Sequence, residues 1–247
     1  AEKKVADAEL AIGKAEKLDP DSADLAVVRA SMQLNEGLTD KALKSFSQAI
    51  LGDSIWSWRS RLLKASILRK RGDTEEALKM LEEATAQAPT ATSSPVSPGS
   101  PWVQLATLQK DLDLDAQAIE SYRQQIFHDR DDANTRLALA KSMEKAGDYQ
   151  GVIDAAWDLP FITPYGDESH ALLGRAYLEL EDWQNARREL ELRLALETPA
   201  MEEIYPDLAW VLWKLGEDTD ALKWARRALM FDPANVRAQQ VVDSLKE

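Results

Sequence analysis

The chain has 247 residues, 45% of them hydrophobic, and a formal net charge of −13 from 30 Lys and Arg against 43 Asp and Glu. This acidity argues against binding to nucleic acid, which needs a clustered basic surface, and the absence of cysteine excludes disulfides, thiolate catalysis and cysteine-bound zinc. No run of about 18 apolar residues is present, so the sequence predicts no membrane-spanning helix.

Small residues recur about every 34 positions, and a second set follows the first at a distance of twelve residues. This period indicates a repeat protein built from one kind of helical hairpin, because two antiparallel helices approach closely only where side chains are small. The first set is Ala30, Ala65, Ala106, Ala140, Gly174 and Ala209, and the second is Ala42, Ala77, Ala118, Val152, Ala186 and Ala221. Each pair of positions marks one predicted hairpin.

In chain order, residues 1–22 are expected to form a partial unit, a second helix without a first. Two-helix units follow, and we place them at 23–57, 58–98, 99–132, 133–166, 167–201 and 202–235. Residues 236–247 are predicted to form a terminal helix with a polar, solubilising face. Glycines that can adopt positive φ fall between the two helices of four units, at Gly37, Gly72, Gly147 and Gly216. The sequence thus predicts a single domain over 1–247, and the partial unit at its start suggests a fragment of a longer array.

Residues 90–101, with the sequence TATSSPVSPGSP, interrupt the period. A Ser- and Pro-rich stretch cannot continue a helix, so it is predicted to form an insertion loop. Its three Ser-Pro pairs, at Ser94, Ser97 and Ser100, leave open whether the loop is phosphorylated. A tolerated insertion is the favoured interpretation, because long surface loops cost little free energy.

A second interruption lies between Trp157 and Gly166, where Pro160 must shorten the second helix of its unit. The apolar side chains there are Trp157, Phe161, Ile162 and Tyr165. We expect them to pack back on the array of helices, and the alternative is an exposed apolar knob that binds a partner.

The repeated residues resemble the tetratricopeptide repeat. The last full unit carries Tyr205, Leu208, Ala209, Leu212, Ala221, Ala225, Ala228 and Pro233 at the spacings of that family, and the unit before it carries Leu173, Gly174, Tyr177, Ala186 and Leu190. The resemblance covers nearly the whole chain. It implies an all-α fold, a right-handed α-solenoid (superhelix) of about six helix–turn–helix repeats with a half-repeat at each end, whose first helices line a concave groove.

By this resemblance, a set of basic, apolar and aromatic residues is expected to line the partner-binding groove: Arg59, Leu62, Arg69, Lys70, Lys110, Lys141, Lys145, Arg175, Trp210, Trp213 and Lys214. The basic bias peaks at residues 56–71, WSWRSRLLKASILRKR, with six cations and no acid. Because Arg binds carboxylates through two parallel hydrogen bonds, an acidic peptide or a chain terminus is the expected ligand. The alternative is that these cations pair with acids of the following helix, Glu75, Glu76, Glu82 and Glu83.

The two groove tryptophans, Trp210 and Trp213, are three residues apart and should share one face of their helix. Such a face suits peptide side chains or sugar rings and can pair with cations. The alternative is that one or both pack against the terminal helix.

The sequence contains no motif for catalysis, metal or cofactor binding. His170 stands where the repeat family usually has an aromatic residue, so a packing role is expected for it. Asp111, Asp113 and Asp115 alternate like the start of a calcium loop, but Tyr122 stands where that loop needs its final glutamate. We interpret these aspartates as turn and cap residues.

Together these features predict a non-enzymatic scaffold or adaptor that holds a segment of a partner protein or peptide in its groove. Two alternatives stay open. One is the periplasmic arm of a bacterial polysaccharide exporter, for which a polysaccharide would be a partner, and the other is the regulatory region of an enzyme whose catalytic domain lies elsewhere. Bacterial cytoplasm and periplasm are both compatible with the sequence, and self-association through an uncapped end is a further option.

Overall fold

A computed structural model of the chain describes residues 2–52, 54, 56–91, 99–163, 166–197 and 201–245, and the side chains of all of these except 2–9 and 201. The chain divides into two compact units, Ala1–Arg130 and Asp131–Glu247. Throughout the described ranges the chain folds into helices joined by turns, without a β-strand. This confirms the predicted all-α class and the helical-repeat solenoid. The assignment to a single domain with the stated unit boundaries stays a prediction.

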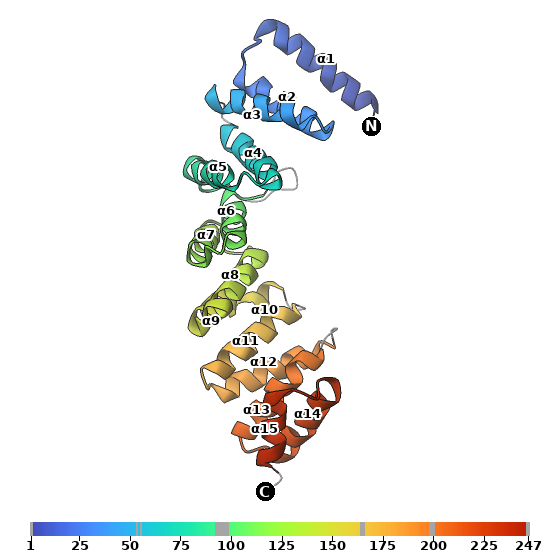
Figure 1. Cartoon of the computed structure of the whole chain (residues 1–247), viewed down its shortest axis with the longest axis vertical. Helices are drawn as coiled ribbons and strands as arrows, with labels where there is room; N and C mark the ends of the chain where they lie inside the picture. The colour runs from blue at the N-terminus through green and yellow to red at the C-terminus, as the bar shows by residue number, and fades with distance from the viewer. Residues whose placement is uncertain are drawn as a thin grey trace. The chain divides into compact units, whose positions relative to one another are not determined.

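The first unit is built from consecutive helical hairpins (Figure 1). Its helices are α1 (Glu2–Leu18), α2 (Ala23–Asn35), α3 (Thr39–Leu51), α4 (Ser57–Arg71), α5 (Thr74–Gln87), α6 (Pro101–Asp111) and α7 (Asp115–His128). The hairpins are α2 with α3, α4 with α5, and α6 with α7. They stack within the unit because α3 also packs on α4, and α5 on α6.

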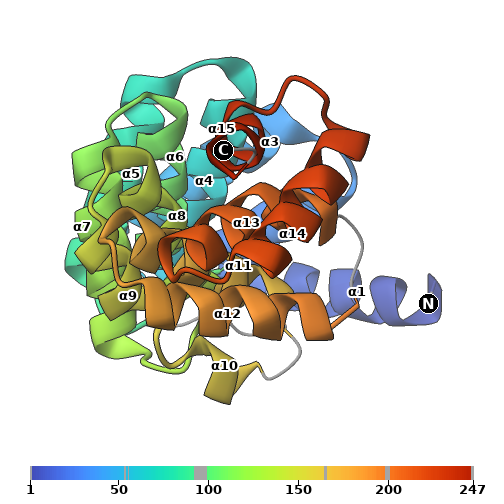
Figure 2. The same ribbon diagram turned by 90° about the horizontal axis from the view of Figure 1, so that it is seen from below.

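The second unit repeats this arrangement, and Figure 2 shows α11 beside α12 and α13 beside α14. Its elements are α8 (Ala133–Ala146), α9 (Tyr149–Ala156), α10 (Leu159–Ile162), α11 (Asp167–Glu179), α12 (Trp183–Ala195), the 3-10 helix η1 (Met201–Ile204), α13 (Tyr205–Lys214), α14 (Asp218–Phe231) and α15 (Val236–Ser244). None of the helices in the described ranges is long and apolar enough to cross a bilayer.

The small residues lie where the paired helices touch. Every predicted position of both sets is buried, from Ala30 and Ala42 in the first hairpin to Ala209 and Ala221 in the last. Gly174 shows how close the contact is, because a methyl group there would lie 2.8 Å from Cδ2 of the buried Leu190. The period of small residues therefore reports the points at which the two helices of a hairpin pack.

The turns within the hairpins use the left-handed backbone region. Gly37, Gly72, Gly147 and Gly216 have φ between 75° and 88°, which confirms the role predicted for them. Two hairpins lack a glycine there, and Asp113 and Glu181 adopt φ of 57° and 59° instead. A non-glycine residue is strained in this region, although the side chain of Asp tolerates it better than that of Glu.

The segment after α9 differs from the prediction. Leu159 of α10 is buried, whereas Trp157 and Phe161 are 58% and 79% exposed, with their rings edge to face at 6.5 Å. The expectation that both rings pack back on the helices was wrong, because Leu159 takes the inner position of the short helix and turns its neighbours outward. Tyr165 lies outside the described residues.

The Ser- and Pro-rich insertion is described only at its two ends. Ser94 and Ser97 lie outside the described residues. Ser100 is buried just before α6, and its hydroxyl donates a hydrogen bond to Oε1 of Gln125. In this fold Ser100 is a packed cap residue that a modifying enzyme could not reach.

Candidate functional site

Of the cavities that α4 helps to line, two lie toward the first helices of the neighbouring hairpins, α2 and α6. The smaller one, of about 320 Å³, lies between α2 and α4 and is lined by Asp24, Val27, Val28, Ser31, Trp56 and Arg59. The larger one, of about 540 Å³, lies between α4 and α6 and is lined by Leu63, Ala65, Ser66, Arg69, Lys70, Leu81, Val103, Gln104 and Thr107. We call them the apolar cavity and the basic cavity.

The basic cavity carries two cations on its α4 wall, Arg69 and Lys70. Arg69 forms an ion pair with Asp111 at the end of α6. Lys70 and the nearby Lys110 are exposed, and neither has a carboxylate partner among the described residues. The hydroxyl of Thr107 donates to the backbone oxygen of Val103 at 2.7 Å. The cavity therefore offers the ammonium group of Lys70 and the guanidinium of Arg69, which Asp111 holds. Lys110 lies outside the lining, about one helical turn beyond the lining residue Thr107 of α6.

The apolar cavity presents hydrocarbon instead. Val28 on α2 and Trp56 at the N-terminal end of α4 are each 46% exposed, while Val27 is buried beneath them. Ser54 fixes this corner, because its hydroxyl donates to Asp24 and accepts the backbone N–H of Trp56 at 3.1 Å. An exposed valine and tryptophan in a shared cavity are suited to contact one apolar side chain of a ligand.

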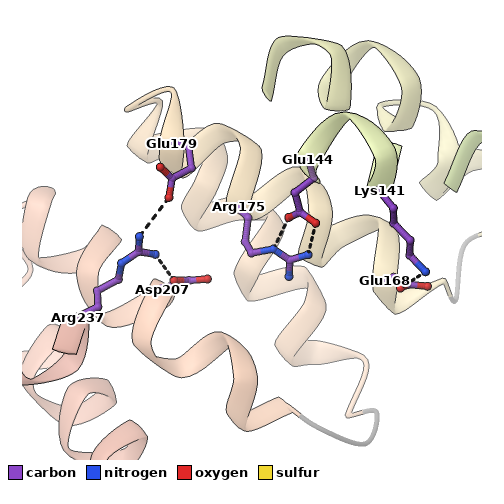
Figure 3. A network of polar contacts seen from close by, with 7 residues as sticks. All are labelled: Lys141, Glu144, Glu168, Arg175, Glu179, Asp207 and Arg237. Atoms are coloured by element: carbon purple, nitrogen blue, oxygen red, sulfur yellow. Dashed lines mark hydrogen bonds and ion pairs between the residues drawn. The ribbon is translucent and has the colours of Figure 1, made fainter. Parts of the chain in front are cut away.

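In the second unit the first helices of the hairpins, α8, α11 and α13, are joined by a ladder of ion pairs (Figure 3). Lys141 of α8 lies 2.5 Å from Glu168 of α11. Arg175 of α11 donates two hydrogen bonds to Glu144 of α8, at 2.6 and 3.3 Å.

Arg237 of α15 completes the ladder by bridging Glu179 of α11, at 3.2 Å, and Asp207 of α13. Burial raises the pKa of Asp207 above its usual value, and the neighbouring charge of Arg237 opposes this shift. Burial tends to lower the pKa of Arg175, but the hydrogen bonds and charge of Glu144 raise it overall. The cations of this ladder are thus already matched by carboxylates of the chain.

The tryptophans of α13 are covered in part by cations of the same unit. The rings of Trp210 and Trp213 meet edge to face at 5.0 Å, and both are half-buried. The ammonium group of Lys214 lies 4.9 and 4.5 Å from their centroids, and the guanidinium carbon of Arg237 lies 5.9 Å from that of Trp210. Trp210 therefore contacts the terminal helix α15.

Two segments of the chain, residues 60–91 and 171–236, match sequence models of the tetratricopeptide repeat. They cover the α4–α5 hairpin and most of the helices from α11 to α14. The chain is a tetratricopeptide repeat protein. No curated protein has significant sequence similarity to it.

Solved structures share the fold of this tetratricopeptide repeat protein at low identity. The C-terminal part of a TPR repeat-containing protein from Cytophaga hutchinsonii is 15% identical with a TM-score of 0.62, over 96% of this chain and 94% of that one. YrrB, described as a TPR protein with an unusual peptide-binding site, is 16% identical with a TM-score of 0.61, over 77% and 94%. MamA is 18% identical with a TM-score of 0.61, over 71% and 91%. Family and fold are those of a repeat scaffold for protein interaction.

Within the tetratricopeptide hairpins of the first unit, α4 separates the predicted groove residues. Arg59 lines the apolar cavity, and Arg69 and Lys70 line the basic one. The prediction that Leu62 lines the groove was wrong. Its side chain is 0% exposed and packs in the core with Ala77 and Leu81 of α5, so it cannot touch a partner.

The alternative of pairing within the hairpin holds for two other cations of α4. Arg61 lies 3.0 Å from Glu83, and Lys64 lies 2.9 Å from Glu76. These side chains face α5, whereas Lys70 faces the cavity toward α6. The basic run in the sequence is therefore divided between the two sides of the helix.

In the second unit the predicted residues Lys141 and Arg175 are joined to acids, as described, and Lys145 is exposed in the last turn of α8. Arg237 and Asp207 were not among the residues predicted from the sequence. Their separation from Glu179 along the chain leaves no local signal, since only the stacking of tetratricopeptide hairpins brings α11, α13 and α15 together.

The α11–α12 hairpin also contains a buried polar cluster that was not predicted from the sequence. Nδ1 of His170 lies 2.8 Å from Oε2 of Glu189, and Arg188 donates to Oε1 of the same carboxylate at 2.8 and 3.1 Å. Burial would raise the pKa of Glu189, but the hydrogen bonds from His170 and Arg188 lower it below the usual value. His170 does pack in the core, and Glu189 is the hydrogen-bond partner of its Nδ1.

Proposed function

We propose that this tetratricopeptide repeat protein is a non-enzymatic scaffold that binds an acidic segment of a partner protein in the basic cavity between α4 and α6. The observation that carries the proposal is Lys70, exposed in the wall of a cavity of about 540 Å³ and without a carboxylate partner among the described residues. Lys110, also exposed and without such a partner there, lies about one helical turn beyond the lining residue Thr107. On a chain with a net charge of −13, cations that form no ion pair with a described carboxylate are available to a ligand.

The energetics support exchange of an internal acid for a ligand acid. Exposed ion pairs stabilise a fold by only about 0–1 kcal/mol, so the pair of Arg69 with Asp111 holds the guanidinium weakly. A ligand carboxylate at the same exposed guanidinium is worth a similar amount, so it can replace Asp111 at little cost in free energy. Binding then depends on several cations, Arg69, Lys70 and Lys110, that act on one acidic segment.

The family supports a protein or peptide as the ligand class. A structural neighbour, YrrB, is described as having a peptide-binding site, and the repeat family is typically non-catalytic. Among the described residues no contact favours a polysaccharide exporter or an enzyme-regulatory region over a scaffold. A sugar ring at Trp210 is disfavoured, because Lys214 and Arg237 already lie over the indole.

The test uses a fluorescein-labelled hexaglutamate peptide flanked by Gly and Ser, with binding followed by fluorescence anisotropy. We expect binding that weakens as salt is raised and that falls at least tenfold in the variant Lys70→Glu/Lys110→Glu. The matched control is Lys41→Glu/Lys79→Glu, which makes the same charge change at exposed lysines of α3 and α5. Equal losses in both variants, or no binding by the wild type, would refute the proposal.

A further inference from the structure

The two cavities beside α4 differ in chemistry but share one helix. Trp56 and Arg59 near its start line the apolar cavity, and Ser66, Arg69 and Lys70 near its end line the basic cavity. A peptide that crosses α4 diagonally would meet the exposed Val28 and Trp56 beside Asp24 and Arg59 on one flank, and Arg69 and Lys70 on the other.

We infer that the partner segment is an extended peptide with one large apolar side chain for the apolar cavity and a pair of acidic residues beginning four or five positions away for the basic cavity. This inference rests on the proposed function, and it adds the composition and spacing of the ligand. Asp24 on the rim of the apolar cavity keeps acidic residues away from that end.

The spacing follows from helix geometry. On α4 the apolar cavity is lined by Trp56 and Arg59, and the basic cavity by residues from Leu63 to Lys70. The midpoints of these two sets are about nine residues apart, or about 14 Å along the axis at a rise of about 1.5 Å per residue, and crossing the helix adds about 10 Å at right angles. The diagonal is about 17 Å, and an extended peptide advances about 3.3 Å per residue. The distance therefore corresponds to about five residues of the ligand.

The apolar residue is assigned to the Val28 and Trp56 side for two reasons. These two side chains are each nearly half exposed, whereas Val27 beneath them is buried. An apolar side chain of the ligand placed here would therefore remove the exposed surface of Val28 and Trp56 from water. In addition, the cavity is lined by one acid and one base, Asp24 and Arg59, whereas the basic cavity is lined by Arg69 and Lys70 and by no acid that the structure describes, so a carboxylate is favoured at the basic cavity.

The experiment uses the whole chain and three labelled peptides in which a Leu precedes a Glu-Glu pair by one, four or nine positions, with Gly and Ser elsewhere. Each is compared with a partner peptide in which Ser replaces Leu, and each pair is also made with the order reversed. We expect the four-position peptide, in at least one order, to bind about tenfold more tightly than its Ser partner. The one- and nine-position peptides should gain less than twofold.

A variant of the protein tests whether the increase in affinity given by Leu arises at the apolar cavity. Val28→Ser should abolish the advantage of Leu while leaving binding of the Ser peptide unchanged, and the control Leu51→Ser, at an exposed position of α3, should change neither. Circular dichroism checks that both variants stay folded. A Leu advantage that survives Val28→Ser, or that does not depend on spacing, would overturn the inference.

The outcomes separate the two proposals. If the Ser peptide binds and Leu adds nothing, the spacing inference fails and the acidic-peptide function stands. If no peptide that contains the Glu-Glu pair binds, the function itself fails.

Discussion

Asp111 lies where an incoming carboxylate would meet Arg69, so a single side chain of the protein competes with the proposed ligand. We predict that Asp111→Asn raises the affinity for hexaglutamate about threefold, because it frees the guanidinium and removes one like charge from the cavity, a gain of about 0.6 kcal/mol on the scale of an exposed ion pair. Asp113→Asn is the control, since it removes the same charge from the exposed turn. Fluorescence anisotropy measures both, and equal affinities of the two variants would contradict the prediction.

Glu189 contributes to stability in a way that depends on its protonation. Its pKa is lowered in the folded state, so the ionised form stabilises the fold above the usual Glu pKa near 4.5. This stability is lost as pH falls below about 4.5 and through the folded pKa.

We therefore predict that Glu189→Gln lowers the free energy of unfolding at pH 7 by about 1–3 kcal/mol, since the buried His170 and the cation of Arg188 lose a charged partner. The dependence of stability on pH between 6 and 3.5 should also flatten. Urea unfolding across this range measures both effects. The exposed Glu202→Gln should leave the wild-type profile intact, and a Glu189→Gln profile parallel to it would argue against the assignment.

At the scale of the element, the hairpin turns are the strained points of the fold. Glu181 adopts φ of 59° at the turn between α11 and α12, where four other hairpins have glycine. Glu181→Gly should raise the free energy of unfolding by about 0.5–1 kcal/mol, because the relief of left-handed strain exceeds the entropy that glycine loses on folding. The reverse change, Gly147→Ala at φ of 75°, should destabilise by a similar amount. Thermal unfolding tests the pair, and shifts of the same sign would contradict the explanation.

The contact within a hairpin is equally specific. Gly174→Ala would place its methyl group 2.8 and 2.9 Å from Cδ2 and Cγ of the fully buried Leu190. Overpacking costs about 1–3 kcal/mol, and the better helix propensity of alanine returns about 1 kcal/mol. The net effect should be destabilisation by about 1 kcal/mol. Gly13→Ala in α1 meets no atom within 4 Å and should not destabilise, so a loss of stability there equal to that of Gly174→Ala would remove the steric argument.

At the scale of the whole molecule, charge is distributed unevenly. Residues 1–130 contain 17 Lys and Arg against 20 Asp and Glu, whereas residues 131–247 contain 13 against 23. The second unit also uses Lys141, Arg175 and Arg237 in its own ion pairs. A hexaglutamate peptide with a photo-crosslinking group should therefore attach to the first unit, around residues 56–110. Mass spectrometry locates the attachment, and crosslinks concentrated in the second unit would contradict this prediction.

Much of the fold was predictable because its cause is local. Ala65 and Ala77 mark one hairpin by their size and spacing, and Gly72 between them marks the turn, since only small residues fit those contacts and glycine adopts positive φ without strain. The exposed rings of Trp157 and Phe161 were not predictable in this way. Their outward position depends on which residue of the short helix after Pro160 enters the core.

The sequence by itself determined the all-α repeat and the basic character of the helix that became α4. Only the tertiary structure decided which of those cations a partner can reach. Lys64 and Lys70 stand in the same run, but one pairs with Glu76 of α5 and the other faces the cavity toward α6. The reason is physical: helix periodicity sends neighbouring side chains in different directions, and the acids they meet come from hairpins whose stacking is not encoded locally.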